Sequence, residues 1–207
     1  LKGVILRVNS PGGSMVASDQ IYHSIETFKR KTKKPVFTSM GTYAASGGYY
    51  IALASDQIFA TPVTITASIG VFSGFLNYSE LQKEWDVDSY SFSTGKYMDS
   101  FSQNQSFSDD DHEMVSSHQH TVYSHFRDRV QQSRDLTDDE ASAVSQGQFM
   151  SGQQAKEFGL VDSIGNYSDV IEAMEDEVGI DSSRLVVYGR PQPTSSFSLF
   201  KFLFNLF

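Results

Sequence analysis

Apolar residues follow two alternating patterns over the first 60 positions of the chain. Short continuous apolar runs, which suit buried strands, alternate with stretches in which apolar residues recur every three or four positions, as on one face of a helix. Strands are expected over 4–8, 35–40 and 57–60, and helices over 16–28 and 49–54. This alternation predicts an α/β fold built of βαβ units, with a mainly parallel sheet flanked by helices.

The pattern after residue 60 is less regular but still indicates elements. Helix starts are expected at Ser108 and Thr137, where a capping side chain precedes acidic residues. The other expected elements are a β-branched stretch over 64–72, a helix over 78–85, a strand over 89–93, a flexible loop over 99–108, a long helix through Val130, a strand, turn and helix over 147–155, a helix over 168–178 and a strand over 185–188. We therefore expect one α/β domain over 1–190 and an apolar tail over 191–207.

Charge and cysteine content narrow the function classes. The 207 residues include 16 basic and 25 acidic side chains, giving a net charge of −9. Nucleic acid is excluded as a partner, because no basic field is available to displace counterions from phosphates. The basic cluster over 29–34 suits the negative end of the first predicted helix. The lack of cysteine excludes disulfides, thiolate metal sites and cysteine nucleophiles.

The start of the chain lies inside a predicted strand and carries no methionine. No run reaches the roughly 18 apolar residues that a membrane span needs. We therefore expect an N-terminally truncated domain from which an N-terminal anchor is missing.

Ser46 stands between the predicted strand over 35–40 and the predicted helix over 49–54, flanked by small residues. A serine at a helix start is commonly an N-cap, whose hydroxyl accepts a backbone hydrogen bond. The alternative is a nucleophile whose developing oxyanion meets free backbone N–H groups. The local sequence leaves both interpretations open.

A serine nucleophile needs a general base, for which the chain offers histidines and lysines. Solvated helix positions are expected for the five histidines, whose spacing does not place them on one face: His23, His112, His118, His120 and His125. Lys96 stands in an otherwise uncharged stretch, which would suit the lowered pKa that a neutral lysine base requires. Taken alone, Lys96 is better explained as a surface lysine.

Five short motifs occur in the order known from one protease family. They are Asn9 to Ser14, Tyr43 to Tyr50, Ala67 to Val71, Thr94 to Tyr97 and Gly152 to Asp162. Together they make the chain resemble the bacterial signal peptide peptidase A family of Ser–Lys membrane proteases, over roughly residues 1–165. The resemblance implies a fold of the Clp-protease and crotonase type.

The resemblance also implies a role for each matching residue. Ser46 corresponds to the nucleophile and Lys96 to the general base. The backbone N–H groups of Gly13 and Gly47 correspond to the oxyanion hole. Ser68 corresponds to a serine that orients the lysine amine, although a packing role between sheet and helix would also suit it. No metal, nucleotide or other cofactor is implied.

Partners and location follow from the same resemblance. The expected substrates are apolar peptides, in particular the remnants of cleaved signal peptides. The similar enzymes form a homo-oligomer of eight protomers, in which neighbouring protomers supply the serine and the lysine of each site. The missing anchor would hold the catalytic domain on the extracytoplasmic side of the bacterial cell membrane.

Two other functions are compatible with such a fold. A crotonase-type acyl-CoA hydratase or isomerase shares the two-donor oxyanion site but needs acidic residues in its pocket, and the sequence near the proposed site offers only Asp19. A non-catalytic assembly subunit would keep the fold without the dyad, although Ser46 and Lys96 are both present.

The last segment, 197–207, has 8 apolar residues in 11 and is too short to span a bilayer. It is expected to be an interface or core segment. The alternative is that it imitates an apolar peptide substrate and lies in the binding groove.

Overall fold

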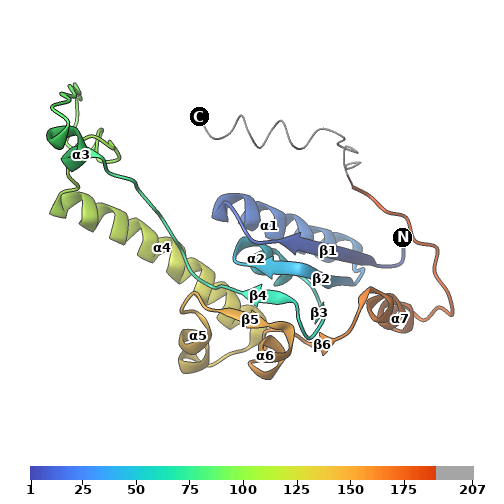
Figure 1. Cartoon of the computed structure of the whole chain (residues 1–207). Helices are drawn as coiled ribbons and strands as arrows, with labels where there is room; N and C mark the ends of the chain where they lie inside the picture. The colour runs from blue at the N-terminus through green and yellow to red at the C-terminus, as the bar shows by residue number, and fades with distance from the viewer. Residues whose placement is uncertain (190–207) are drawn as a thin grey trace.

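The computed structural model describes residues 1–189, and within this range the strands form one six-stranded sheet (Figure 1). The strands are β1 (Val4–Ser10), β2 (Val36–Ala45), β3 (Gln57–Ala60), β4 (Ile65–Ala67), β5 (Phe149–Ser151) and β6 (Ser163–Ile164). The strand order is β5-β4-β2-β3-β6, and β1 pairs in addition with β2. Among these strands the β4–β5 pair is antiparallel and the other pairs are parallel. The predicted, mainly parallel sheet is therefore confirmed.

Strand β2 is the organising strand of this sheet. Its first part pairs with both β1 and β3, and its last part, Tyr43–Ala45, pairs with β4. Pairing with β4 keeps the backbone of β2 extended to Ala45, five residues beyond the expected end of the strand at residue 40. As a result β2 ends directly before Ser46.

The helices begin and end close to the expected positions. They are α1 (Met15–Thr32), α2 (Gly47–Ala52), α3 (Ser79–Glu84), α4 (Asp109–Arg134), α5 (Asp138–Val144), α6 (Gly152–Glu157) and α7 (Tyr167–Val178). Capping boxes at Ser108 and Thr137 confirm the two predicted helix starts. The basic cluster lies at the end of α1, as predicted.

Both faces of the sheet are covered, as parallel strands require. Helices α1, α2 and α4 pack on the face that carries Val8 and Ile58. Helix α7 packs on the opposite face, where Phe37 and Phe59 contact Val170. Neighbouring residues of one strand, such as Ile58 and Phe59, are therefore buried on opposite faces of the sheet. This explains why the strands have continuous apolar sequences.

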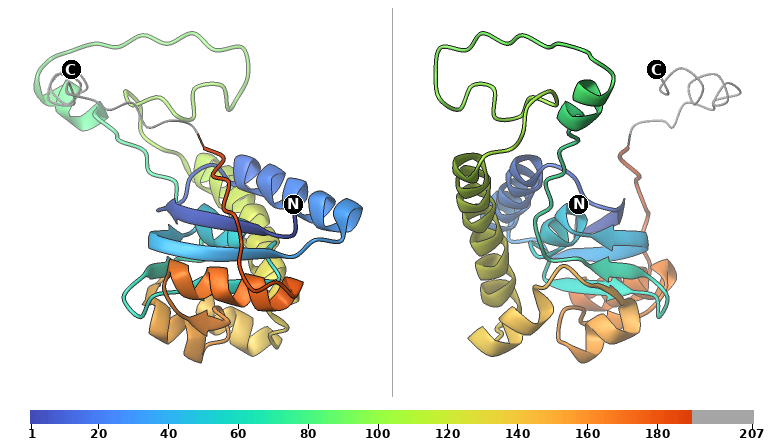
Figure 2. Two further views of the ribbon diagram at one scale, coloured as in Figure 1. Left: turned by 90° about the vertical axis from the view of Figure 1, so that its right-hand side faces the viewer. Right: turned by 60° about the vertical axis from the view of Figure 1, so that its left-hand side comes forward.

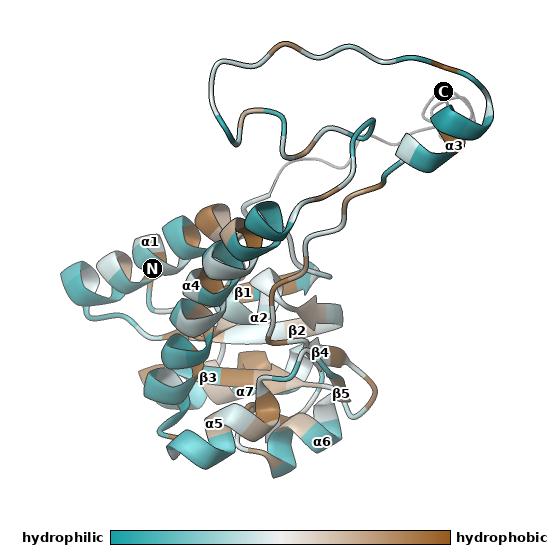
Figure 3. Ribbon diagram, turned by 90° about the vertical axis from the view of Figure 1, so that its left-hand side faces the viewer, coloured by the Kyte–Doolittle hydropathy of each residue, from teal (hydrophilic) through white to brown (hydrophobic). Residues whose placement is uncertain are grey.

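The segment from residue 72 to 107, called the arm below, leaves the sheet after β4 and returns at the start of α4. Figures 1 and 2 show the arm, with α3 at its far end, projecting beyond the layer of strands and helices. Apolar residues are scattered along it in Figure 3, and the side chains of Phe72, Trp85 and Phe92 are exposed. No helix in the described range is both long and apolar enough to cross a bilayer.

Two predicted strands are wrong. Residues 89–93 and 185–188 are irregular and exposed, because neither segment lies against a strand that could pair with it or a core that could bury one of its faces. The expected loop over 99–108 is irregular, with turns. The tail over 191–207, including both interpretations of 197–207, lies outside the described residues, so the domain boundary at 190 stays a prediction.

Candidate functional site

Ser46 forms the single-residue junction between β2 and α2. Its backbone has φ 52° and ψ −122°, a conformation that a non-glycine residue adopts only when the surroundings enforce it. The enforcing bonds run from the Ser46 N–H to the Ala67 carbonyl (2.8 Å) and from the Tyr50 N–H to the Ser46 carbonyl (2.9 Å). Within the described residues the Ser46 hydroxyl makes no capping hydrogen bond. Ser46 therefore occupies the N-cap position of α2 without using its hydroxyl as a cap, which leaves the hydroxyl available for chemistry.

The Pro-Gly-Gly turn after β1 lies directly against Ser46. A Cβ placed on Gly12 would come within 2.8 Å of the Ser46 Cβ and 3.1 Å of its Oγ, and Gly12 has φ +122°. A Cβ placed on Gly47 would lie 3.3 Å from the backbone nitrogen of Gly13. The two expected oxyanion donors, Gly13 and Gly47, thus lie side by side next to the serine. A side chain at Gly12 would collide with Ser46, so this close approach needs a glycine at that position.

A pocket of about 390 Å³ opens beside Ser46. It is lined by Ser46, Ser68, Gly70, Val71, Phe72, Tyr123, Ser145, Gln146 and Gly147. The structure therefore brings Ser68 to the same pocket as Ser46, while its role in orienting the lysine amine stays a prediction. Ser68 also has a positive φ of 51°, and its N–H donates to the Gln148 carbonyl (2.9 Å).

Sequence reasoning missed the half of this pocket that comes from residues 123–147. Tyr123 belongs to α4, and Ser145, Gln146 and Gly147 follow the end of α5. Nothing in the local sequence marks Ser145, which reaches the pocket only because β5 pairs with β4. A signal was available for Gly147, since a glycine just after a predicted helix suggests a positive φ, here +82°.

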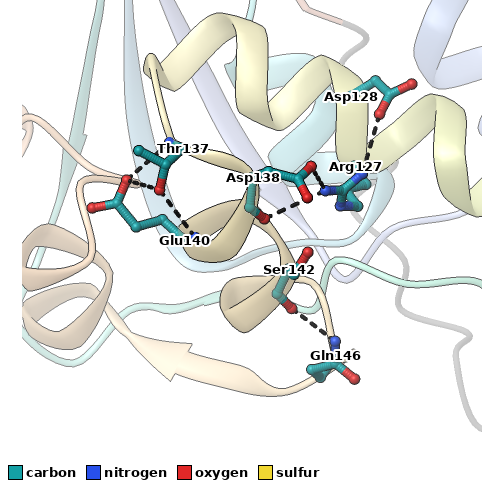
Figure 4. Close-up of polar contacts among 7 residues, drawn as sticks. All are labelled: Arg127, Asp128, Thr137, Asp138, Glu140, Ser142 and Gln146. Atoms are coloured by element: carbon teal, nitrogen blue, oxygen red, sulfur yellow. Dashed lines mark hydrogen bonds and ion pairs between the residues drawn. The ribbon is translucent and has the colours of Figure 1, made fainter.

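Helix α5 holds this second half in place. Figure 4 shows the Thr137–Glu140 capping box at its start and the ion pair of Arg127 with Asp138, which ties the helix to α4. At its end, the side-chain amide of Gln146 donates to the Ser142 carbonyl (2.7 Å), also drawn in Figure 4. The loop after α5 is therefore fixed at the pocket by its own helix.

Lys96 is not brought to Ser46 in this structure. It lies on the arm and lines a separate pocket of about 250 Å³. Its side chain is 62 % exposed and forms an ion pair with Asp110 in the first turn of α4. The hydrogen bond to Asp110 is the main reason why the pKa of Lys96 lies above its ordinary value. The expected uncharged setting is wrong, because α4 brings acidic residues to the lysine.

The histidines are exposed, as predicted, and belong to the surface rather than to the pocket. His125 is 3.0 Å from the hydroxyl of Tyr50, which donates to Asp19. Burial, followed by the hydrogen bond to Asp19, raises the pKa of Tyr50 to about 12. Burial also disfavours the charged form of Asp19, but hydrogen bonds from Tyr50 and His125 outweigh it and lower the pKa of Asp19. The Asp19 carboxylate is thus engaged with Tyr50 and His125.

The motif from Gly152 to Asp162 has a structural role. Arg134 donates to the Gly159 carbonyl (2.7 Å) and to both carboxylate oxygens of Asp162 (2.6 and 3.1 Å), and the Ile58 N–H donates to the same carboxylate (2.7 Å). These bonds tie α4 to β3 and the chain before β6. In the described range no group of His, Cys, Asp and Glu side chains could hold a metal ion.

Comparison with known proteins places this geometry in a family. The chain is 34% identical over 188 residues to an Enterococcus faecium protein provisionally named signal peptide peptidase SppA, covering 91% of this chain and 54% of the relative. It is 37% identical over 177 residues to Protease 4 of Haemophilus influenzae, covering 84% of this chain and 28% of the relative. The chain therefore spans about half, or less, of the length of these relatives.

The fold is similar to that of a point mutant of ClpP1 from Listeria monocytogenes, with a TM-score of 0.52, 17% sequence identity, and coverage of 82% of this chain and 77% of the other. This likeness confirms the predicted Clp-protease-like fold. The names of the relatives support a serine peptidase. Residues 28–181 match peptidase family S49, and the chain belongs to that family, which confirms the resemblance seen in its five motifs.

Proposed function

We propose that the chain is the catalytic part of a serine endopeptidase whose nucleophile is Ser46. The observation that carries this proposal is the hydroxyl of Ser46, which makes no capping hydrogen bond. Ser46 lies in a strained turn next to Gly12 and Gly47, and it lines a pocket. Strain of this kind costs roughly 1–3 kcal/mol and persists where function requires it. A serine that served only to cap the helix would need no such conformation.

In the proposed acylation step, Ser46 Oγ attacks the peptide carbonyl carbon while a neutral lysine amine takes the hydroxyl proton. The N–H groups of Gly13 and Gly47 stabilise the oxyanion, each contributing typically about 3 kcal/mol. The protonated amine then donates to the leaving amine. Water activated by the same lysine hydrolyses the acyl-enzyme and regenerates the serine.

The base in this proposal is Lys96 of a neighbouring protomer. None of the pocket-lining residues in the described part of the chain is Lys, His, Asp or Glu, so the site lacks a base of its own. The arm, to which Lys96 belongs, projects beyond the sheet and its helices in Figure 1, and we propose that a second copy lies against it. Association that buried Lys96 and separated it from Asp110 would lower its pKa toward the working range. A ring of eight protomers is the proposed assembly.

The proposed substrates are apolar peptides, including the remnants of signal peptides. Val71, Phe72 and Tyr123 line the pocket beside Ser46 and provide apolar contacts for a substrate side chain. We place the enzyme at the bacterial cell membrane, with the catalytic domain on the extracytoplasmic side and an anchor outside the present chain. No cofactor takes part in this mechanism.

The alternatives lack a comparable observation. An acyl-CoA hydratase or isomerase requires an acidic residue in the pocket, and the one candidate, Asp19, is engaged with Tyr50 and His125. A non-catalytic assembly subunit would not need the strained conformation of Ser46. We therefore retain only the peptidase proposal.

The test is hydrolysis of a fluorogenic apolar peptide by the wild type, Ser46→Ala and Lys96→Ala. Lys83→Ala is the matched control, because Lys83 is also an exposed arm lysine paired with an acidic residue, Glu80 (2.8 Å). We expect both dyad variants to be inactive and the control to retain activity. An active Lys96→Ala variant would show that the base lies elsewhere.

Mixing the two inactive variants tests whether neighbours share the site. In an equal mixture, half of the sites have an intact Ser46 and half of their neighbours supply an intact Lys96, so about a quarter of the sites should work. A mixture that assembles but stays inactive would contradict the shared site, while leaving the role of Ser46 itself intact.

A further inference from the structure

Ser145 is the buried polar residue of the pocket. It follows the last residue of α5, is only 1 % exposed and lines the same pocket as Ser46 and Ser68. Its hydroxyl has no hydrogen-bond partner among residues 1–189. A buried hydroxyl without a partner costs free energy, so Ser145 is a candidate to bind a polar group that enters the pocket.

The backbone on both sides holds Ser145 firmly in place. The side-chain amide of Gln148 donates to the Ala143 carbonyl (2.7 Å), which closes the loop after α5. The N–H of Gly147 donates to the Ile69 carbonyl (3.0 Å), one residue from Ser68 in the chain. Ser145 therefore belongs to a loop that is bonded directly to the segment carrying Ser68.

The mechanism proposed above leaves one hydrogen-bonding group of the base unaccounted for. A neutral lysine amine has one lone pair and two N–H donors. The lone pair must face the hydroxyl of Ser46, and Ser68 is expected to accept one N–H. The second N–H needs another acceptor close to the first, because an unpaired donor in a dehydrated site would be costly.

We propose that the hydroxyl of Ser145 accepts the second N–H of the Lys96 amine of the neighbouring protomer. Ser145 is then a positioning residue, acting with Ser68 to aim the lone pair of the base at Ser46. This inference rests on the proposed function, since it needs Lys96 to enter the pocket. It gives each of the three serines of the pocket a separate part in proton transfer.

Three consequences follow for Ser145→Ala. Loss of an orienting acceptor lowers kcat about tenfold with little change in KM, since Ser145 does not bind the peptide. The lost acceptor stabilises the charged ammonium more than the neutral amine, so the pKa of the base falls. The rising limb of kcat/KM against pH therefore moves to lower pH, by about one unit. The melting temperature of the assembled enzyme falls by no more than about 4 °C, because the substitution removes a single hydrogen bond worth about 1 kcal/mol.

The experiment measures kcat, KM, their pH profiles and the melting temperature for the wild type, Ser145→Ala and Lys96→Ala. Ser142→Ala is the matched control, because Ser142 lies in the last turn of α5, three residues before Ser145, but does not line the pocket. Ser145→Cys, with a side chain of similar shape that accepts hydrogen bonds weakly, should shift the pH profile in the same direction as Ser145→Ala. It also provides the test if the alanine variant does not fold.

The outcomes separate this inference from the proposal on which it rests. If Lys96→Ala is inactive but both Ser145 variants keep the wild-type pH profile, the role of Ser145 is overturned and the dyad stands. If Ser145→Ala loses activity and stability together with no pH shift, Ser145 is a packing residue. If Lys96→Ala is active, both the dyad and the role of Ser145 fall.

Discussion

Replacing Gly12 by alanine tests the close packing of the turn after β1 against the nucleophile. The new Cβ would lie 2.8 Å from the Ser46 Cβ and 3.2 Å from the Ala45 carbonyl oxygen. Neither atom can be moved by a simple side-chain rotation, so the backbone at the junction of β2 and α2 must shift. Alanine must also adopt φ +122°, a region that L-residues avoid.

The cost of this substitution can be estimated from two terms. Backbone strain at such a φ costs roughly 1–3 kcal/mol, and overpacking costs typically about 1–3 kcal/mol. We expect the free energy of unfolding to fall by about 3 kcal/mol. For a chain of this length the melting temperature then falls by about 6–12 °C. Because the shift displaces Ser46 or the N–H of Gly13, kcat/KM should fall at least about 100-fold.

Circular dichroism during heating measures the loss of stability in Gly12→Ala, and peptide hydrolysis measures its loss of kcat/KM. Gly179→Ala is the matched control, since Gly179 has φ +66° but no atom within 4 Å of an added Cβ. The control should lose only about 1 kcal/mol, the cost of the left-handed backbone, and keep its activity. Equal melting temperatures for the two variants, with normal kcat/KM for Gly12→Ala, would refute the packing of Gly12 against Ser46.

Three further substitutions test parts of the fold away from the nucleophile. Arg134→Met leaves the Asp162 carboxylate without its guanidinium and should lower the free energy of unfolding in urea by about 2 kcal/mol. Gly152→Ala should cost about 3 kcal/mol, because the added Cβ would overlap the carbonyl oxygen of Thr61. Asp19→Asn should flatten the acid side of the melting temperature against pH. The folded pKa of Asp19 lies below the ordinary 3.8, so its stabilisation is present above that pH and lost as pH falls through the lower folded value.

Each of these predictions has a defined contrary result. Wild-type stability of Arg134→Met in urea would show that the bidentate pair contributes nothing. Normal stability of Gly152→Ala would mean that α6 does not press against the chain between β3 and β4. An acid limb of Asp19→Asn that follows the wild type would place the acid-sensitive carboxylates elsewhere. Glu80→Gln is a suitable control for the last, because Glu80 is an exposed residue on the arm.

Local signals in the sequence were sufficient for most of the elements. Apolar runs and helical spacing located β1, α1, β2 and β3, because each buries one face or both against a core. Side-chain caps located the starts of α4 and α5, since the capping bonds involve only neighbouring residues. The same logic failed for 89–93 and 185–188, where alternation and β-branched residues indicated strands. A strand also needs a partner, and partners are not a local property.

For the candidate site too, local features could be predicted from the sequence, whereas contacts between distant residues could not. The sequence by itself determined that Ser46 lies at a strand-to-helix turn, that glycines lie before and after it, and that the chain resembles a Ser–Lys peptidase. Only the tertiary structure decided that the Ser46 hydroxyl caps nothing, that Ser145 joins Ser68 in one pocket, and that Lys96 pairs with Asp110 instead of reaching the serine. The physical reason is distance along the chain. Turn and cap geometry is set by adjacent residues, whereas the pocket and the charge of the lysine depend on groups brought together by strand pairing and helix packing.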